Sequence, residues 1–432
     1  MATSEPYDIG MLSVAENEKI TRVGPGTPMG NLMRRYWQPA ALSRELPESD
    51  GPPLRVRLLG EDLIAFRDSD GKVGLVDAFC PHRRAPMFFG RNEECGLRCV
   101  YHGWKFDRSG ACVDMPSEPA DSLFKTKVGI AAYPTWEGGG IVWAYMGPRA
   151  KQPAPPDYEW VRAPDTHRFV SKTHEDANWL QGLEGGLDTA HSSFLHNEKL
   201  GDKSLLRSRD GHPRLEVEKS AYGFRYASLR DLGDDGLYVR IYQYMMPWQQ
   251  QRGSVTALSG GRNKVPKAAG HLWVPIDDTH TFVYNTLVSY DAQVPIPDAY
   301  AWEEEARFGR GKDDLLPGFR LRANIENDYQ IDRNVQKTTT YTGIRGVNTQ
   351  DMALQEGMGP TCDRSKEHLG TSDRAVIAAR QLLLEACDAV ERDEEPPGAD
   401  PATYCNVRPY DNFLSRDDNW REAFASELIA KW

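Results

Sequence analysis

Two short pairs of metal-binding residues constrain this chain more than any other feature of its sequence. Cys80-x-His82 and Cys99-x2-His102 lie with residues 83–98 between them. Two thiolates and two imidazoles can bind Zn²⁺ tetrahedrally, or a [2Fe–2S] cluster with Cys on one iron and His on the other. Each pair mixes one Cys with one His, so each loop can offer one ligand to each iron. A zinc finger would place its two histidines on one helix, so the pattern favours the iron–sulfur cluster.

Composition excludes several other classes of protein. The chain has 432 residues, 40% hydrophobic and 27% charged, which is ordinary globular usage for about two or three domains. The net charge of -11 argues against nucleic acid as a partner. No apolar run approaches the roughly 18 residues that span a bilayer, and the polar N-terminus lacks signal-peptide features. We therefore expect a cytoplasmic protein with reduced thiols and no membrane partner.

The pattern of apolar residues predicts an α+β protein. Its strand segments are rich in β-branched and aromatic residues. We expect strands at 54–60, 62–66, 72–79, 138–147, 214–230, 236–246, 271–276 and 281–290. We expect helices at 28–40, where a proline stands at the start, and at 373–395, which is amphipathic. Strands and helices fall into separate runs, which is typical of the α+β class.

A proline-rich stretch divides the chain. Residues 148–157 hold four prolines and form the best candidate linker. The sequence predicts a small all-β domain at 41–155 before it and a larger domain at 156–432 after it. The larger domain should contain a central antiparallel sheet flanked by helices, with a helical segment at 1–40 packed on it.

A second group of metal-binding residues lies in NWLQGLEGGLDTAHSSFLH. On one helix, Glu184, Asp188 and His191 would share a face. His196 would point about 140° away from His191, because a helix has about 3.6 residues per turn. The two histidines can therefore meet at one metal only if the helix ends or distorts near Ser192. Spacing alone also allows two partly buried histidines in a core.

The first motif resembles a known family. FCPHRRAP and RCVYHGWKFD resemble the two ligand loops of Rieske [2Fe–2S] domains. The resemblance implies that Cys80 and Cys99 bind one iron and that His82 and His102 bind the other. The histidine pair raises the reduction potential above that of an all-Cys cluster. A zinc-stabilised binding module remains an alternative and predicts a colourless protein.

The second motif resembles the Glu-x3-Asp-x2-His-x4-His signature of Rieske non-haem iron ring-hydroxylating oxygenases. This likeness implies that His191 and His196 bind a mononuclear Fe(II). It makes Asp188 a bridge from a cluster histidine of a neighbouring chain to His191, and Glu184 a supporting residue behind the ligands. Such a bridge fixes imidazole orientation. It implies a homo-oligomer, as a trimer or as stacked trimers.

The third iron ligand should be a carboxylate, because such sites use two histidines and one acid. The acid lies far along the chain, so spacing cannot choose among the candidates Asp328, Asp332, Asp351 and Asp363. TGIRGVNTQDMALQEGMGP at 342–360 resembles the family segment that supplies the ligand. The resemblance therefore favours Asp351.

The likeness extends along the chain to the phthalate dioxygenase branch, through EKITRVGPGTPMGNLMRRYWQP, SAYGFRYASLR and MGPTCDRSKEHLGTSD. It implies a terminal oxygenase that hydroxylates an aromatic acid with O2. The electrons would come from NAD(P)H through a flavin and iron–sulfur reductase, or through a ferredoxin. Ring dihydroxylation and O-demethylation of a methoxylated acid both stay open. A Rieske electron carrier without oxygenase activity is the alternative of another class.

An acidic aromatic substrate would need cations inside this acidic protein. Arg207 and Arg240 are the candidates, because a guanidinium group can bind a carboxylate through two parallel hydrogen bonds. Arg240 lies on an expected strand, one face of which should look into the catalytic cavity. A solvated surface arginine or a structural ion pair is the competing interpretation for both.

Overall fold

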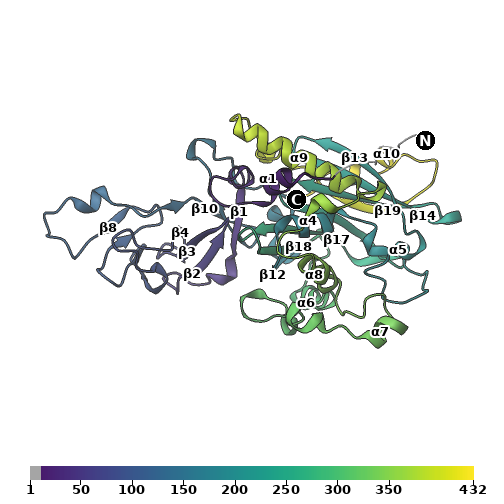
Figure 1. Ribbon diagram of the computed structural model, residues 1–432, viewed down its shortest axis with the longest axis horizontal. Coiled ribbons are helices and arrows are strands. Elements are labelled where there is room, and N and C mark those ends of the chain that lie inside the picture. The colour runs from purple at the N-terminus through teal and green to yellow at the C-terminus, as the bar shows by residue number, and fades with distance from the viewer. Residues whose placement is uncertain (1–10) are drawn as a thin grey trace.

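A small β unit projects from one side of a larger body in the computed structural model, which describes residues 11–432 (Figure 1). The small unit contains the strands β1 (Trp37–Leu42), β2 (Leu54–Leu58), β3 (Glu61–Arg67), β4 (Val73–Asp77), β5 (Arg91–Glu93), β6 (Gly96–Arg98), β7 (Lys105–Phe106), β8 (Cys112–Asp114), β9 (Ala132–Tyr133), β10 (Thr135–Gly138) and β11 (Ile141–Tyr145). They form three antiparallel sheets, in the orders β2-β3-β4-β9, β5-β6-β7-β8 and β1-β11-β10.

One large antiparallel sheet forms the centre of the body. Its strands are β12 (Arg168–Glu175), β13 (Arg214–Ser220), β14 (Gly223–Asp231), β15 (Leu237–Met245), β16 (Gln249–Thr256), β17 (Arg262–Pro275), β18 (Thr281–Ser289) and β19 (Tyr410–Leu414). Strands β13 to β18 follow one another as a meander, β12 pairs with β18, and β19 pairs with β15. The predicted central antiparallel sheet is confirmed. The single strand expected at 214–230 is the hairpin of β13 and β14.

Helices pack on this sheet and on one another. They are α1 (Val14–Thr21), α2 (Pro28–Met33), α3 (Glu159–Arg162), α4 (Trp179–Leu187), α5 (Leu206–Arg209), α6 (Asp298–Arg307), α7 (Arg333–Thr338), α8 (Val347–Gly357), α9 (Arg374–Glu391) and α10 (Trp420–Ala423). Helix α9 packs on β13, β14, α1 and α2, and α4 packs on β16 and β17 beside α8 (Figure 1). No helix within residues 11–432 combines the length and hydropathy that crossing a bilayer requires.

The N-terminal segment differs from the helix expected at 28–40. Helix α2 ends at Met33, and β1 starts at Trp37 and pairs with β11. All six residues of β1 are buried, so this pairing outweighs the local helical spacing. The expected boundary at residue 40 falls inside β1, and residues 1–10 of the N-terminal segment lie outside the described residues.

Three glycines allow α4 to lie directly against its neighbours. A Cβ atom added at Gly182 or Gly186 would lie less than 3.0 Å from the Trp273 side chain on β17. A Cβ atom at Gly185 would approach the Gln355 side chain of α8 equally closely. A side chain at Gly182 or Gly186 would push α4 away from the sheet, whereas the flexible end of Gln355 can move aside from one at Gly185. The glycines therefore set the position of the segment that follows α4.

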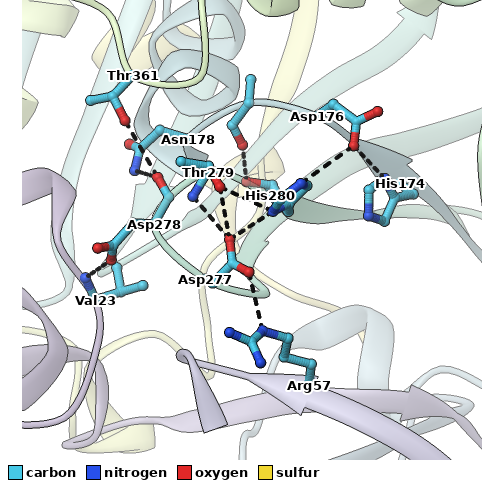
Figure 2. Close-up of polar contacts among 12 residues, drawn as sticks. Val23, Arg57, His174, Asp176, Asn178, Asp277, Asp278, Thr279, His280 and Thr361 are labelled. Carbon is cyan, nitrogen blue, oxygen red and sulfur yellow. Dashed lines mark hydrogen bonds and ion pairs between the residues drawn. The ribbon is translucent and has the colours of Figure 1, made fainter. Parts of the chain in front are cut away.

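The loop between β17 and β18 joins the two parts of the molecule. The backbone N–H of Gly60, in the turn after β2, donates to the carbonyl of Ile276 at 2.8 Å. Figure 2 shows Asp277 between His280 and Arg57, with distances of 2.8 Å to His280 Nδ1 and 3.1 Å to Arg57 Nε. Because Arg57 belongs to β2, both backbone and side-chain bonds hold the small unit on the body.

Candidate metal centres

The four predicted cluster residues lie on two loops with the same backbone hydrogen bonds. In each loop the amide four residues after the cysteine donates to the cysteine carbonyl at 2.9 Å, from Arg84 to Cys80 and from Gly103 to Cys99. Arg84 and Gly103 both have positive φ, at 57° and 80°. The two loops therefore reverse direction in the same way.

The side chains of these loops converge at the surface of the small unit. Cys80 and Cys99 are buried and contact each other, while His82 is exposed and its ring lies 4.4 Å from that of His102. Trp104 stacks on His82 at 4.3 Å. The Nδ1 atom of His102 is buried without a hydrogen-bond partner in the described chain. Two buried thiols, two imidazoles and this unpartnered nitrogen fit a [2Fe–2S] cluster.

The structure brings His191, His196 and Asp351 together in the body. The two histidine Nε2 atoms are 3.1 Å apart. Asp351 Oδ1 lies 3.1 Å from His196 Nε2 and 3.6 Å from His191 Nε2. All three ligand atoms lie within 4.8 Å of one another. Two imidazoles and one carboxylate on one side of a point fit Fe(II) and leave positions open for other ligands.

Hydrogen bonds at the far side of each ring orient both imidazoles. His191 Nδ1 lies 3.2 Å from Asp188 Oδ2, and His196 Nδ1 lies 2.8 Å from Gln350 Oε1. The amide of Gln350 donates in turn to the Ile344 carbonyl at 2.8 Å, which fixes its orientation. Both Nε2 atoms are thus left for a metal. The sequence offers no spacing signal for Gln350.

The helix ends before Asp188 and His191, so the two residues do not share a helix face with Glu184. Helix α4 stops at Leu187, and Asp188 has extended backbone angles (φ -67°, ψ 130°). Its carboxylate accepts a hydrogen bond from the Ala190 N–H at 2.7 Å. Such local side-chain bonds compete with helical ones. The chain turns here, so two histidines five residues apart can reach one point.

Comparisons with known proteins found two matching families and several relatives. The Rieske [2Fe-2S] domain family matches residues 36–134, and the family described as LigXa C-terminal domain like matches residues 144–431. The phthalate 4,5-dioxygenase oxygenase subunit of Pseudomonas putida is 41% identical over 95% of this chain and 94% of its own. The chain belongs to the Rieske non-haem iron oxygenases. This Rieske oxygenase is an oxygenase subunit of the phthalate dioxygenase-like branch.

Other relatives of this Rieske oxygenase have different named activities. The 5,5'-dehydrodivanillate O-demethylase oxygenase subunit of Sphingobium sp. is 33% identical over 91% of this chain and 85% of its own. The solved structure of Pseudomonas putida CBB5 NdmA shares the fold, with a TM-score of 0.61 at 18% identity over 90% of this chain and 98% of its own. The protein is thus a terminal oxygenase with a Rieske cluster, a mononuclear iron and O2 as a substrate.

A cavity of about 530 Å³ in this Rieske oxygenase lies beside the candidate iron-binding group, which consists of His191, His196 and Asp351. His191, His196 and Asp351 line it. Alternate residues of neighbouring strands form another wall, including Tyr238, Arg240 and Tyr242 of β15 and Arg252, Ser254 and Thr256 of β16. Alternation places these side chains on one face of the sheet. The volume suits a small organic ligand.

Both predicted arginines lie in the cavity wall. Arg207 donates from Nη2 to the His196 carbonyl at 2.6 Å, and its Nε is buried without a partner in the described chain. Arg240 donates from Nε to the Gly253 carbonyl at 2.8 Å. Burial lowers the pKa of Arg207 to about 10, so it is still charged at neutral pH. The cavity therefore carries positive charge inside a negatively charged protein.

A third arginine, Arg252, was missed from the sequence. No hydrogen bond or ion pair engages its guanidinium within residues 11–432. Burial first, and then Arg240 and Arg310, lower its pKa to about 10, so it too is charged at neutral pH. The segment QQQRGS is polar and lacks the β-branched residues of a strand, so β16 was not predicted. Because β16 was not recognised as a strand, the local sequence could not indicate that Arg252 faces the cavity.

Glu184 does not contact the iron-binding group, and it does not line the cavity. Its carboxylate lies 2.8 Å from Arg364 Nη2 and 2.7 Å from Arg380 Nε on α9. Arg364 is 0% exposed. Glu184 therefore anchors α4, and through α4 it holds the segment that carries Asp188.

We expect Glu184→Gln to destabilise the protein by about 3–5 kcal/mol, because it leaves the buried Arg364 without its carboxylate partner. Although burial raises the pKa of Glu184, Arg364 and Arg380 lower it below its ordinary value on balance. Its contribution should be fully present above the unfolded pKa of about 4.3 and be lost as pH falls through the folded value. Thermal unfolding of variant and wild type between neutral and acidic pH checks this. Equal melting temperatures at neutral pH would contradict it.

The other candidate carboxylates have partners away from the cavity. Asp332 accepts a hydrogen bond from the Asn334 N–H at 2.8 Å and caps α7. Asp363 lies 2.8 Å from Lys366 Nζ at the surface. Asp328 belongs to an irregular turn and does not line the cavity. Of the four candidates, Asp351 alone lies beside His191 and His196.

Proposed function

We propose that this Rieske oxygenase hydroxylates an aromatic carboxylic acid. The observation that carries the proposal is the cavity, where Arg207, Arg240 and Arg252 share one space with the iron-binding group.

The assigned iron ligands are Cys80, His82, Cys99 and His102 for the cluster and His191, His196 and Asp351 for Fe(II). We also assign residues 41–155 to the Rieske domain and 156–432 to the catalytic domain, and the matched family ranges support this division.

Different residues of the chain would bind the substrate and orient the iron ligands. When bound, Fe(II) supplies the activation of O2 with electrons from the cluster. Arg252 is free to bind the substrate carboxylate, and Arg240 and Arg207 add positive charge to the same cavity. Asp188 and Gln350 hold the two ligand imidazoles in place. The cavity would place the aromatic ring beside the two ligand histidines and Asp351.

Electron delivery requires a neighbouring chain in this proposal. The side chain of Asp188 is 26% exposed, and His82 lies exposed at the surface of the small unit. Figure 1 shows the end of that unit, near β8, well away from α4. We therefore place the cluster of one chain against Asp188 of the next, in a trimer or in stacked trimers. A flavin and iron–sulfur reductase, or a ferredoxin, would supply electrons from NAD(P)H.

Ring dihydroxylation is the proposed reaction, since the relative at 41% identity is named a dioxygenase subunit. O-demethylation is the second candidate, favoured by the relative at 33% identity. Product analysis with phthalates, benzoates and methoxybenzoates, NADH and a surrogate reductase tests both. A cis-diol supports dihydroxylation, and formaldehyde supports demethylation. Oxygen consumption without any oxidised aromatic product would contradict the proposed substrate class.

We expect Arg252→Met to weaken the binding of benzoate and phthalate about tenfold to a hundredfold, because a charged hydrogen bond is lost. Calorimetry under anaerobic conditions without reductase measures binding with no turnover. Arg416→Met is the matched control, because Arg416 is half exposed and pairs with Asp231. Neutral benzamide should bind both variants alike. A loss for benzamide equal to that for benzoate would show that Arg252 acts by shape and not by charge.

A further inference from the structure

His271 on β17 is a buried histidine that neither metal centre uses. It is 4% exposed, and it lines the cavity. Asn285 stands directly opposite on β18, and His271 Nδ1 lies 2.8 Å from Asn285 Oδ1. Which of the two ring nitrogens carries the proton decides what His271 can offer a ligand.

The neighbours of Asn285 determine this tautomer. The Nδ2 atom of Asn285 lies 3.2 Å from Ser171 Oγ and 3.4 Å from the carbonyl of Val283. A carbonyl only accepts, so the amide nitrogen must face it. The amide oxygen therefore faces His271 and can only accept a hydrogen bond. The proton must then be on His271 Nδ1.

The same network is anchored at its other end by a buried ion pair. The hydroxyl of Ser171 donates to Glu305, so its oxygen remains free to accept from the Asn285 amide. Glu305 in turn lies 2.8 and 2.9 Å from two guanidinium nitrogens of Arg310. Each hydrogen bond in this network can therefore have only one donor. The Asn285 amide donates to Ser171, and Ser171 donates to the Glu305 carboxylate.

A neutral His271 with its proton on Nδ1 carries a lone pair on Nε2. Burial lowers the pKa of His271 well below its ordinary range, and Arg252 and Arg310 lower it further. Within residues 11–432, no hydrogen bond engages Nε2, and this atom keeps some solvent exposure. The lone pair is therefore open to the cavity.

Arg252 and His271 are neighbours on the same wall. In the pairing of β16 with β17, Gln250 stands opposite His271 and Arg252 stands opposite Ala269. Arg252 is thus diagonal to His271 on the same face, and such positions lie about 7–8 Å apart. The wall presents a cation beside a hydrogen-bond acceptor.

We propose that His271 determines specificity for an aromatic acid that also carries a hydroxyl or amino group. That group donates to His271 Nε2 while the carboxylate binds Arg252. The inference rests on the proposed function, because it needs the acid to bind in this cavity. A methoxy group at the same ring position has no proton to donate, so its oxygen lone pair would face the lone pair of Nε2 and repel it. His271 therefore selects between substrates that Arg252 alone would accept equally.

Binding of matched ligand pairs to the anaerobic holoenzyme tests this proposal. The probes are benzoate and its 2-, 3- and 4-hydroxy and methoxy derivatives, measured by calorimetry without reductase. At one ring position, the hydroxy derivative should bind about three- to tenfold more tightly than its methoxy partner. His271→Phe should abolish that preference and leave benzoate binding in place. His271→Gln should restore part of it, because a glutamine oxygen can replace Nε2 as acceptor.

A second variant tests the tautomer itself. Asn285→Asp should hold His271 in its protonated form, so that Nε2 becomes a donor and the preference moves to the methoxy derivative. The visible spectrum of the cluster and the melting temperature show whether each variant is folded.

Equal binding of every hydroxy and methoxy pair to wild type overturns the inference, as does a preference that survives His271→Phe. If benzoates bind through Arg252 without a hydroxyl preference, the proposed function stands and this inference fails. If no benzoate binds, both fail.

Discussion

Replacing Asp351 by Asn is expected to lower the iron content from about three to about two atoms per chain, since the two-iron cluster remains and the mononuclear iron is lost. An amide cannot supply the negative charge that the third ligand brings to Fe(II). In the structure Asp351 Oδ1 lies within 3.6 Å of both histidine Nε2 atoms, so its loss removes one of three converging donors.

Metal analysis of the purified protein, together with the visible absorption of the cluster, measures this result. The cluster spectrum should be unchanged, because the cluster ligands lie in the small unit. Asp363→Asn is the matched control, since Asp363 is a neighbouring acid that pairs with Lys366 at the surface. It should keep about three irons. Full iron content in Asp351→Asn would remove Asp351 from the ligand set.

Replacing Asp188 by Asn should have the opposite pattern, with about three irons per chain and a normal cluster but slow electron transfer between the centres. Oδ1 and Oδ2 of Asp188 accept separately from the Ala190 N–H and from His191, and the side chain keeps 26% exposure. An amide has one acceptor atom, so it cannot also accept an imidazole N–H from a neighbouring chain. We expect transfer to fall about 10- to 100-fold or more.

Stopped-flow oxidation of the pre-reduced cluster, with O2 and an aromatic acid in a single turnover, measures this rate. Asp202→Asn is the control, because Asp202 lies in the same part of the chain and pairs with Lys199. Its rate should match that of wild type. Single-turnover oxidation at the wild-type rate in Asp188→Asn would refute the bridge.

The two metal motifs differ in how much of each was visible in the sequence. The cluster residues lie on two loops whose backbone bonds are local, from Arg84 to Cys80 and from Gly103 to Cys99. Short-range spacing therefore predicts this group. The iron-binding group combines two near histidines with Asp351, which is far along the chain. Helical spacing left open whether the histidines meet; they do so through a turn, because α4 ends at Leu187.

Strand β16 shows why part of the cavity could not be predicted. Its polar sequence has low strand propensity, and it is a strand because β15 and β17 pair with it on either side. Unless β16 is recognised as a strand, the sequence does not indicate that Arg252 faces the cavity or that Gln250 stands opposite His271. Glu184 is a related case, since its partners Arg364 and Arg380 come from distant segments. The helical spacing that associated Glu184 with the metal did not reveal them.

The sequence by itself predicted the cluster, because ligand type and short spacing are local properties, and it predicted the iron only through the family resemblance of its second motif. It also determined the α+β class through periodicity. Only the tertiary structure decided which carboxylate joins the histidines, which arginines face the cavity, and how His271 is protonated. The physical reason is that these properties depend on the partners a side chain has or lacks. Those partners come together only when distant strands pair and α4 closes against the sheet.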